Sequence, residues 1–511
     1  MPFKGSRSLT LVIGLLIVGC ADLPKDTQRI PSTAVPNYLD TSVGQLFEEA
    51  ASQHPGESGF AIIRWGREAF TDRIALTELA EKSLDLQYYI WEPDATGHIL
   101  AQRLIRAADR GVRVRILVDD INLAGRDPFV AAMDAHPGIE IRIFNPFANR
   151  SVRFFDVALD LDRVNHRMHN KTMNADNAVA IVGGRNVGDI YFQVATETNY
   201  RDLDVAAAGP IVREISNVFD YFWNGEWAVP ITALVDRPYG NKDLEAFRAY
   251  LHDRIAGYDY PYALDEDVEA LRERLTSERD QFVWARGQIV WDDPAAIEGH
   301  SEQGRIMKGL AEKVDSLREE LLIESAYFVI KQPYVDKVRE LTDRGVRVRV
   351  LTNSLASNDV IAAHAGHAKH REDLLANGME LYEWRADAGA IRKRLRSTAK
   401  SRAALHAKAL VFDRESVFIG SFNLDPRSAS INTEAGLYVE SPELAQQVIA
   451  YMDQAVRPEN SYKVELDEDG DLVWLTEVDG QQVQLHEEPG SSFTNDFLTG
   501  LIMILPVEDQ L

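Results

Sequence analysis

HNKTMNAD (169–176) and HAKALVFD (406–413) are two copies of one pattern: a histidine, a lysine two positions later and an aspartate five positions after the lysine. In an extended strand alternate side chains share a face, so the histidine and lysine of each copy point the same way. An imidazole nitrogen and an ammonium group on one face can meet the same phosphoryl group. The pattern therefore predicts a site for phosphodiester transfer. Its catalytic candidates are His169, Lys171, Asp176, His406, Lys408 and Asp413.

The aspartates that end the two copies, Asp176 and Asp413, fall where each strand is expected to turn back. Aspartate at such a turn commonly accepts hydrogen bonds from nearby backbone N–H groups. We therefore assign these two carboxylates a structural role first and a catalytic role second.

A glycine-rich segment follows each copy, seven positions after its aspartate: GGRN (183–186) in the first half and GSFN (420–423) in the second. Glycine lets the backbone approach a ligand closely, and asparagine can donate to a phosphate oxygen. The predicted substrate-binding residues are Asn186, Asn423 and Ser421. Gly184 stands where the second half has Ser421, so the first half lacks one candidate phosphate donor.

A pair of acidic residues follows from aligning YRDLDVAAAGP (200–210) with NTEAGLYVESP (432–442), which match without a gap and place Asp202 opposite Glu434. A carboxylate here would hold the far nitrogen of its histidine, which fixes the tautomer and raises the basicity of the ring. The alternative is an exposed strand carboxylate without such a role.

The two halves look duplicated. DRGVRVR occurs at 109–115 and again, unchanged, at 343–349, inside the same predicted order of helix, strand, helix, strand. These copies lie 234 residues apart and the two motif histidines lie 237 apart, so whole domains rather than single motifs are repeated.

The overall composition is that of a folded protein with a strong acidic excess. The 511 residues are 45% hydrophobic, and 80 acidic against 55 basic residues give a formal charge of −25. This length suggests two large domains. The negative charge disfavours nucleic acid as a partner and gives little attraction to anionic lipid.

The N-terminus has the pattern of a lipoprotein signal. Lys4 and Arg7 precede an apolar run at 9–18 that is too short to span a bilayer and ends at Cys20, the only cysteine. We expect lipidation of Cys20 and a lipid-anchored protein of the cell envelope that faces the periplasm. The alternative is an ordinary secretory signal with a chance cysteine.

Several stretches together resemble the phospholipase D superfamily and, within it, bacterial cardiolipin synthases of the lipoprotein branch. They are LDLQYYIW (84–91), ADRGVRVRILVDD (108–120), RMHNKTMNADNAVAIVGGRNVGDIYF (167–192), RVLTNSLASNDV (349–360), LHAKALVFD (405–413) and FIGSFNLDPRSASINTEAGL (418–437). The motifs are highly specific for phosphodiester transfer and less specific for the substrate.

The resemblance implies an α/β fold class with two duplicated phospholipase D-type α-β-α sandwich domains, related by a pseudo-two-fold axis. The two motif strands would then face each other in a single site within one monomer. In this family scheme His169 attacks phosphorus and His406 is the general acid and base, while lysines and asparagines neutralise the phosphate oxygens. The resemblance implies neither a cofactor nor a metal.

The expected domain organisation has six parts. They are a signal peptide at 1–19, a tether at 20–43, a first phospholipase D-like domain at 44–235, a helical connector at 236–285, a second such domain at 286–460 and a strand-like tail at 461–511.

The leading hypothesis for function is a phosphatidyltransferase that makes cardiolipin by transphosphatidylation onto phosphatidylglycerol, with or without phosphatidylethanolamine as phosphatidyl donor. Two alternatives remain open: a phospholipase D that hydrolyses phospholipids to phosphatidic acid, and a non-catalytic lipid-binding module of the envelope. A nuclease is disfavoured by the acidic charge and the export signal.

Three other polar clusters receive structural interpretations. AAHAGHAKH (362–370) places histidines at three-residue steps, for which a surface helix is favoured over a metal site. Asp119 and Asp120 end a predicted strand, where solvation in a loop is favoured over a metal pair. The basic run at 391–402 suits a rim that collects anionic headgroups and a solvated loop equally well.

Overall fold

The computed structural model describes residues 29–261, 268–295, 305–389 and 401–491, together with Leu23 and Thr27. The predicted signal peptide, Cys20, most of the basic run and residues 492–511 of the expected tail lie outside the described residues.

The first half of the chain alternates helices and strands and then continues into a helical segment. Its elements are η1 (Tyr38–Asp40), α1 (Ser42–Ala51), β1 (Ser58–Ile63), α2 (Gly66–Leu79), β2 (Ser83–Tyr88), α3 (Ala95–Asp109), β3 (Arg113–Asp119), η2 (Asp120–Asn122), α4 (Asp127–Asp134), β4 (Ile139–Phe144), α5 (Phe154–Leu159), α6 (Leu161–Asn165), β5 (Thr172–Ala175), β6 (Val179–Gly183), β7 (Thr198–Arg201), β8 (Asp204–Ala208), α7 (Pro210–Asn224), β9 (Ala228–Pro230), η3 (Ile231–Ala233), α8 (Asn241–Ala256) and α9 (Val268–Arg279).

The second half repeats this order. Its elements are β10 (Val283–Trp291), α10 (Arg305–Asp315), β11 (Glu320–Ser325), α11 (Gln332–Asp343), β12 (Arg347–Asn353), α12 (Ile361–Ala368), α13 (Arg371–Ala376), β13 (Glu380–Trp384), β14 (Arg402–Leu405), β15 (Lys408–Phe412), β16 (Ser416–Gly420), α15 (Pro426–Ser430), β17 (Ala435–Glu440), α16 (Pro442–Ala455), β18 (Ser461–Leu466), β19 (Leu472–Val478) and β20 (Gln481–Leu485).

Strand pairing confirms the duplicated α/β fold. The first sheet has the order β1-β8-β6-β5-β2-β3-β4-β9, and the second has the matching order β10-β17-β16-β15-β11-β12-β13-β18. In each sheet three neighbouring strands, β2-β3-β4 or β11-β12-β13, are parallel, as expected for strands joined by helical crossovers. β1 also pairs with β10, so the two sheets are continuous.

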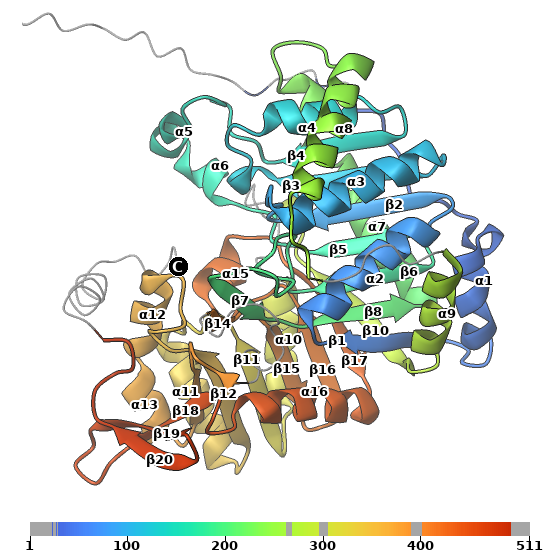
Figure 1. Cartoon of the computed structure of the whole chain (residues 1–511). Helices are drawn as coiled ribbons and strands as arrows, with labels where there is room; N and C mark the ends of the chain where they lie inside the picture. Colours follow the sequence, from blue (N-terminus) through green and yellow to red (C-terminus); the bar gives the residue numbers. More distant parts are fainter. Residues whose placement is uncertain are drawn as a thin grey trace, which may run out of the picture.

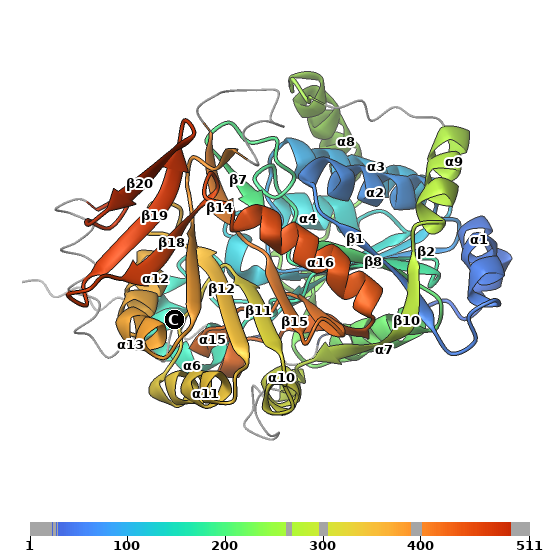
Figure 2. The ribbon, with the colours of Figure 1, turned by 90° about the horizontal axis from the view of Figure 1, so that it is seen from below.

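The region expected as a helical connector, 236–285, contains α8 and α9 and also the start of β10. The segment expected as a tail supplies β18, β19 and β20, and β18 pairs with β13 at the edge of the second sheet. Figure 2 shows these strands at the outer edge of that sheet, with α16 lying across its inner strands. The described part of the tail is therefore integral to the second domain.

The repeated DRGVRVR segment has the same physical task in both halves. Gly111 and Gly345 adopt φ angles of 97° and 82°, in the left-handed region where glycine ends a helix at little cost. The Asp-Arg pair before each glycine closes α3 or α11, and the Val-Arg-Val-Arg after it starts β3 or β12. Both copies are therefore a helix end followed by a buried parallel strand.

The two halves share a hydrophobic core. Ile211 and Ile215 of α7 lie in one cluster with Leu444 and Val448 of α16, between the two sheets, while separate clusters fill the outer side of each half. Figure 1 shows the first domain above and the second below, with α2 and α3 on the outer face of the first sheet. The halves pack as one body, which the active site requires.

Asp176 and Asp413 have the structural role predicted for them. Each lies at the end of a motif strand with a positive φ, 55° and 49°. The carboxylate of Asp176 accepts hydrogen bonds from the backbone N–H groups of Glu81, Lys82 and Ser83 at 2.7 to 2.9 Å. Asp413 does the same for the three residues that lead into β11. These carboxylates fix the turn of each motif strand against the strand beside it.

We expect Asp176→Asn to lower the free energy of unfolding by about 1–3 kcal/mol. The amide oxygen can still accept a hydrogen bond, but the amide NH₂ group would face backbone N–H donors that the second carboxylate oxygen now satisfies. Denaturant unfolding would measure this, with Asp413→Asn as the matched variant of the second half. Turnover per folded molecule should stay near that of the unsubstituted chain. A large loss of turnover at unchanged stability would show a catalytic role instead.

Two structural interpretations from the sequence are wrong. His364 and His367 of α12 are buried, with Nε2 atoms 2.9 and 3.2 Å from carboxylate oxygens of Glu488 and Glu383, so α12 is not a surface helix. Asp119 and Asp120 are also fully buried and are not solvated. Asp119 accepts from the Met168 N–H at 2.8 Å and lies 3.2 Å from Arg167, and so supports the chain entering the first motif. No group of three or more metal-binding side chains occurs in the described ranges.

Candidate active site

The backbones of the two halves pair with each other at the point where the motifs begin. β7 of the first half pairs in parallel with β14 of the second, with Arg201 opposite Leu405, and the His406 N–H donates to the Arg201 carbonyl at 2.8 Å. In the same way the His169 N–H donates to the Thr433 carbonyl at 2.8 Å. Figure 1 shows β7 and β14 side by side between the domains. Each motif histidine is therefore anchored to backbone of the opposite half.

The histidine side chains are held by carboxylates that also come from the opposite half. Nδ1 of His406 lies 2.6 Å from Oδ2 of Asp202, and Nδ1 of His169 lies 2.8 Å from Oε2 of Glu434. Both carboxylates are fully buried. With Nδ1 bound to a carboxylate, Nε2 is the nitrogen directed away from it and toward a substrate. The sequence predicted the residue types correctly, but it associated each carboxylate with the histidine of its own half, and this pairing is wrong.

The motif lysines lie beside the histidines, as the strand pattern predicted. Nζ of Lys171 donates to the His169 carbonyl at 2.5 Å, and Lys408 donates to the His406 carbonyl. Burial lowers the pKa of both ammonium groups, and that of Lys171 falls well below its ordinary value. Each ammonium group is thus kept out of water. In this buried position a bound phosphate anion would balance its charge.

The reactive side chains of the two halves affect one another's pKa values. Burial lowers the pKa of His169 well below its ordinary value, and the charges of Lys171, Lys408 and His406 lower it further. Burial and the charges of Lys408 and Lys171 likewise lower the pKa of His406, although Asp202 opposes this shift. Such mutual effects require short distances between groups of the two halves. The pair of histidines therefore forms one site.

Comparison with known proteins agrees with this geometry. The family model described as "Cardiolipin synthase, PLD-like domain" matches residues 74–223 and 310–456. Cardiolipin synthase C of Escherichia coli is 38% identical over 462 residues, which cover 89% of this chain and 97% of that protein. The chain belongs to the cardiolipin synthase-like family of the phospholipase D superfamily. Its two matched segments each contain one motif histidine.

More distant relatives share the same family or fold. A cardiolipin synthase of Clostridium perfringens is 24% identical over 382 residues, which cover 74% of this chain and 66% of that protein. The crystal structure of phosphatidylserine synthase from Haemophilus influenzae matches with a TM-score of 0.54 at 14% identity, over 82% of this chain and 92% of that one. The latter likeness concerns the fold alone.

The two carboxylates of this phospholipase D-like site are positioned by different means. The Ser421 hydroxyl donates to Oε2 of Glu434 at 2.5 Å and accepts from the Ala435 N–H at 3.0 Å. Ser421 therefore orients Glu434, and its contact with substrate stays a prediction. At the equivalent place in the first half, Gly184 lets the shorter Asp202 pack directly on the backbone: a Cβ at Gly184 would lie 2.1 Å from Oδ1 of Asp202.

Gly184→Ala should displace the Asp202 carboxylate from His406, because the added methyl group and Oδ1 cannot occupy the same space. A misplacement of about 1 Å in such a site can lower turnover on the order of 100-fold. Steady-state kinetics would measure the loss. Gly309→Ala is the control, because a Cβ at Gly309 meets nothing within 4 Å. Equal turnover of both variants would contradict the steric argument.

The two asparagines predicted to bind substrate differ in their surroundings. Oδ1 of Asn186 accepts from the Ile90 N–H at 3.0 Å, so this side chain is fixed to the loop after β2. Asn423 is buried, and its Oδ1 has no hydrogen-bond partner among the described residues. An acceptor oxygen buried without a partner costs free energy that a substrate hydroxyl could recover by donating to it, whereas an ionised phosphate oxygen could not. The environment of Asn423 therefore suits a substrate contact better than that of Asn186.

Aromatic side chains around the histidines were missed by the sequence analysis. The ring of Tyr89 contacts the ring of His169 edge-on, with 4.8 Å between their centroids. Tyr200 stacks on His406 with 4.8 Å between the ring centroids, and Tyr191 contacts His406 edge-on at 5.1 Å. These rings limit how the imidazoles can rotate and shield them from water. Tyr89 follows the last residue of β2 and is half-buried, and a tyrosine beside a core strand is an ordinary residue, so no local signal marked it.

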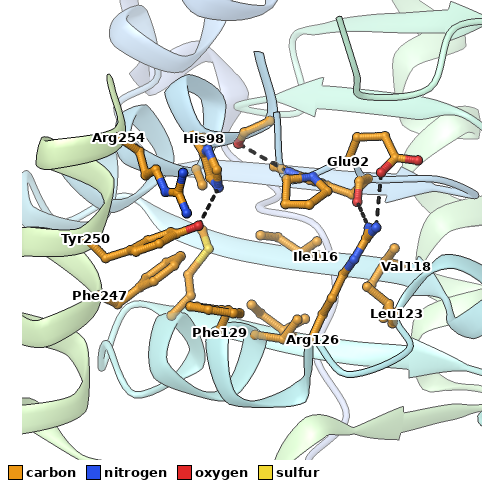
Figure 3. Close-up of a pocket in the computed structure, with 17 residues that line it drawn as sticks. Glu92, His98, Ile116, Val118, Leu123, Arg126, Phe129, Phe247, Tyr250 and Arg254 are labelled. Atoms are coloured by element: carbon orange, nitrogen blue, oxygen red, sulfur yellow. Dashed lines mark hydrogen bonds and ion pairs between the residues drawn. The ribbon is translucent and has the colours of Figure 1, made fainter. Parts of the chain in front are cut away.

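A separate apolar cavity of about 480 Å³ lies in the first half, between α3, α4 and α8. Figure 3 shows the Glu92–Arg126 ion pair (3.1 Å) at one end and the His98–Tyr250 contact (3.4 Å) at the other, with Phe129 between them. None of the predicted site residues lines it. The reactive groups instead lie between the two halves.

Proposed function

We propose that this protein is a phosphatidyltransferase that makes cardiolipin by transphosphatidylation onto phosphatidylglycerol, through a phosphohistidine intermediate. The observation that carries the proposal is the pair of histidines, each fixed through Nδ1 by a buried carboxylate of the other half. Two such imidazoles with buried lysines beside them are equipped for attack on phosphorus and for proton transfer to the leaving oxygen. Membership of the cardiolipin synthase-like family supports phospholipids as the substrates.

The proposed reaction has two displacements at one phosphorus atom. Nε2 of His169 attacks the phospholipid phosphorus, the bond from phosphorus to the headgroup oxygen breaks, and that oxygen takes a proton from His406. A glycerol hydroxyl of phosphatidylglycerol then gives its proton to His406 and attacks the same phosphorus. The phosphorus–nitrogen bond breaks, which releases cardiolipin and restores both histidines. Lys171 and Lys408 would balance the charge on the phosphate oxygens.

The difference between the two carboxylates supports this division of labour. Burial opposes ionisation of Asp202, but the charge and hydrogen bond of His406 outweigh burial and hold the pKa of Asp202 well below its ordinary value. An ionised Asp202 opposes the lowering of the His406 pKa by burial and by the two lysines, and so favours the protonated form that a general acid requires. Burial instead raises the pKa of Glu434 to about 7, so His169 faces a partner that is partly neutral. A neutral His169 is the form that can attack phosphorus.

The direct test is to incubate the full chain with phosphatidylglycerol and phosphatidylethanolamine that carry different acyl chains, and to analyse the lipids by mass spectrometry. Cardiolipin with only the phosphatidylglycerol chains would identify phosphatidylglycerol as donor and acceptor. Cardiolipin of mixed chains would identify phosphatidylethanolamine as donor. His169→Ala is the control and should yield neither product.

The same experiment separates the alternatives. Phosphatidic acid as the main product would mean that water is the acceptor and that the chain is a phospholipase D hydrolase. Unchanged lipids, from a preparation that is folded and saturated with both lipids, would contradict catalysis and leave a lipid-binding role.

We also propose that Cys20 carries a lipid anchor and that the protein faces the periplasm from a membrane of the cell envelope. The basic residues, the short apolar run and the cysteine that ends it support this. Among the described residues no helix is long and apolar enough to cross a bilayer. Mass spectrometry of the mature N-terminus would test the anchor, with Cys20→Ser as control; an unmodified Cys20 in membrane-extracted protein would overturn it.

A further inference from the structure

Exposed apolar side chains gather on the short helices α5 and α6, just before the first motif. Five large hydrophobic residues within ten positions are exposed by 42 to 71%: Val152, Phe154, Val157, Leu159 and Leu161. We call this set the apolar rim. Soluble surfaces rarely concentrate such side chains, and a cluster of this kind marks a surface that meets a protein or a membrane.

The apolar rim stands on a fixed base. The buried carboxylate of Asp120 binds Arg150 and, at 2.8 Å, Arg153 at the start of α5. Arg150 also pairs with Asp127 of α4 through a contact of 2.8 Å. At the far end Arg163 donates to Oδ1 of Asn145 at 2.7 Å. The exposed side chains are therefore held outward by buried polar contacts beneath them.

This surface is directly connected to the active site. α6 ends at Asn165, whose Oδ1 accepts from Arg427 of the second half at 2.8 Å. The next residue, His166, contacts the Ile431 carbonyl at 2.6 Å, and His169 follows three positions later. Figures 1 and 2 both show α6 beside α15 of the second half. The apolar rim thus borders the seam between the halves where the chain enters the first motif and reaches His169.

We propose that the apolar rim inserts into the surface of the phospholipid bilayer and sets the active site against the headgroups. This inference rests on the proposed function, since it assumes that the substrate lies in a membrane. α5 and α6 are too short to span a bilayer, so their apolar side chains would enter only the boundary between headgroups and acyl chains.

The charge of the chain favours this mode of contact. A formal charge of −25 gives little electrostatic attraction to anionic lipids such as phosphatidylglycerol. Apolar insertion does not depend on charge and can hold the protein to such a surface. An N-terminal lipid anchor would keep the protein near the membrane, but attachment at one point would not by itself determine which face of the domains meets the bilayer. The apolar rim would supply the orientation.

The test compares two double variants of the full chain, each in a Cys20→Ser background so that no lipid at that residue contributes. Phe154→Ser/Leu159→Ser removes the two most exposed side chains of the apolar rim. Leu39→Ser/Val478→Ser removes two other exposed apolar side chains outside the apolar rim, at 44 and 42%. Co-sedimentation with phosphatidylglycerol vesicles and turnover in those vesicles are measured beside turnover of a short-chain phosphatidylglycerol below its micellar concentration.

In the rim variant, vesicle binding and turnover of vesicle lipid should both fall by roughly tenfold or more. Its turnover of the monomeric lipid, and all three quantities in the control variant, should stay unchanged. Equal vesicle binding by both variants would overturn the inference. An equal loss on the monomeric lipid would also overturn it, because the rim would then act through the fold of the site. Vesicle binding by the rim is measured without catalysis, so an inactive parent protein would contradict the proposed function and not this inference.

Discussion

Replacing either motif histidine with alanine is expected to lower phosphatidyl transfer on the order of 10⁴- to 10⁶-fold, as for other residues that act as a catalytic unit. The reason is geometric: each imidazole is anchored at its backbone N–H and at Nδ1 by the opposite half, so no neighbouring group can take its place. Steady-state assays on phosphatidylglycerol vesicles would measure both losses.

The two variants should differ in the intermediate they accumulate. His169→Ala has no nucleophile, so rapid denaturation at neutral pH, where the phosphorus–nitrogen bond survives, should trap no phosphatidyl group on the protein. His406→Ala should still form the adduct on His169 slowly, and peptide mass spectrometry should find it there. His252→Ala is the control, because that side chain is 77% exposed and far from any motif in sequence. A phosphatidyl group on His406 in the unsubstituted protein would reverse the two roles.

Asp202→Asn is expected to lower turnover on the order of 10²- to 10⁴-fold, although Asp202 belongs to the first half and His406 to the second. The substitution keeps the shape but removes the charge that stabilises a protonated His406 and fixes its tautomer. The protein should remain folded, so thermal unfolding is measured alongside kinetics. Unaltered turnover would mean that the 2.6 Å contact between Asp202 and His406 has no part in catalysis.

The pH dependence separates Asp202 from Glu434. The pKa of Asp202 is held low, so its carboxylate is ionised throughout pH 5 to 9 and the loss in Asp202→Asn should vary little over that range. The pKa of Glu434 is raised to about 7, so Glu434 is mostly neutral below pH 7 and ionised above it. Glu434→Gln should therefore cost little at low pH and progressively more as the pH rises through 7. Parallel pH profiles for the two variants would contradict this assignment.

The duplicated fold and the reactive residues could be predicted because their signals are local. A histidine and a lysine two positions apart share a strand face wherever the strand lies, and a helix end marked by glycine can be recognised in both copies. The structural role of Asp176 and Asp413 followed from turn chemistry in the same way.

The contact of each carboxylate with the histidine of the opposite half could not be predicted, because it depends on how the two domains pack. The alignment placed Asp202 opposite Glu434 correctly, yet only the pairing of β7 with β14 brings Asp202 to His406. The same holds for the hydrogen bond from Ser421 to Glu434, which no local pattern in the sequence indicated. The tyrosines around the histidines come from separate segments, and their convergence leaves no pattern in any one of them.

The crossed carboxylates have a consequence for the life of the polypeptide before it is complete. Synthesis runs from the N-terminus, so His169 exists for 265 residues before its partner Glu434 is added. A nascent or prematurely ended chain, or a fragment cut between the halves, carries a histidine without its acid. The complete site, which could act on the cell's own phospholipids, therefore forms only after Glu434 has been synthesised.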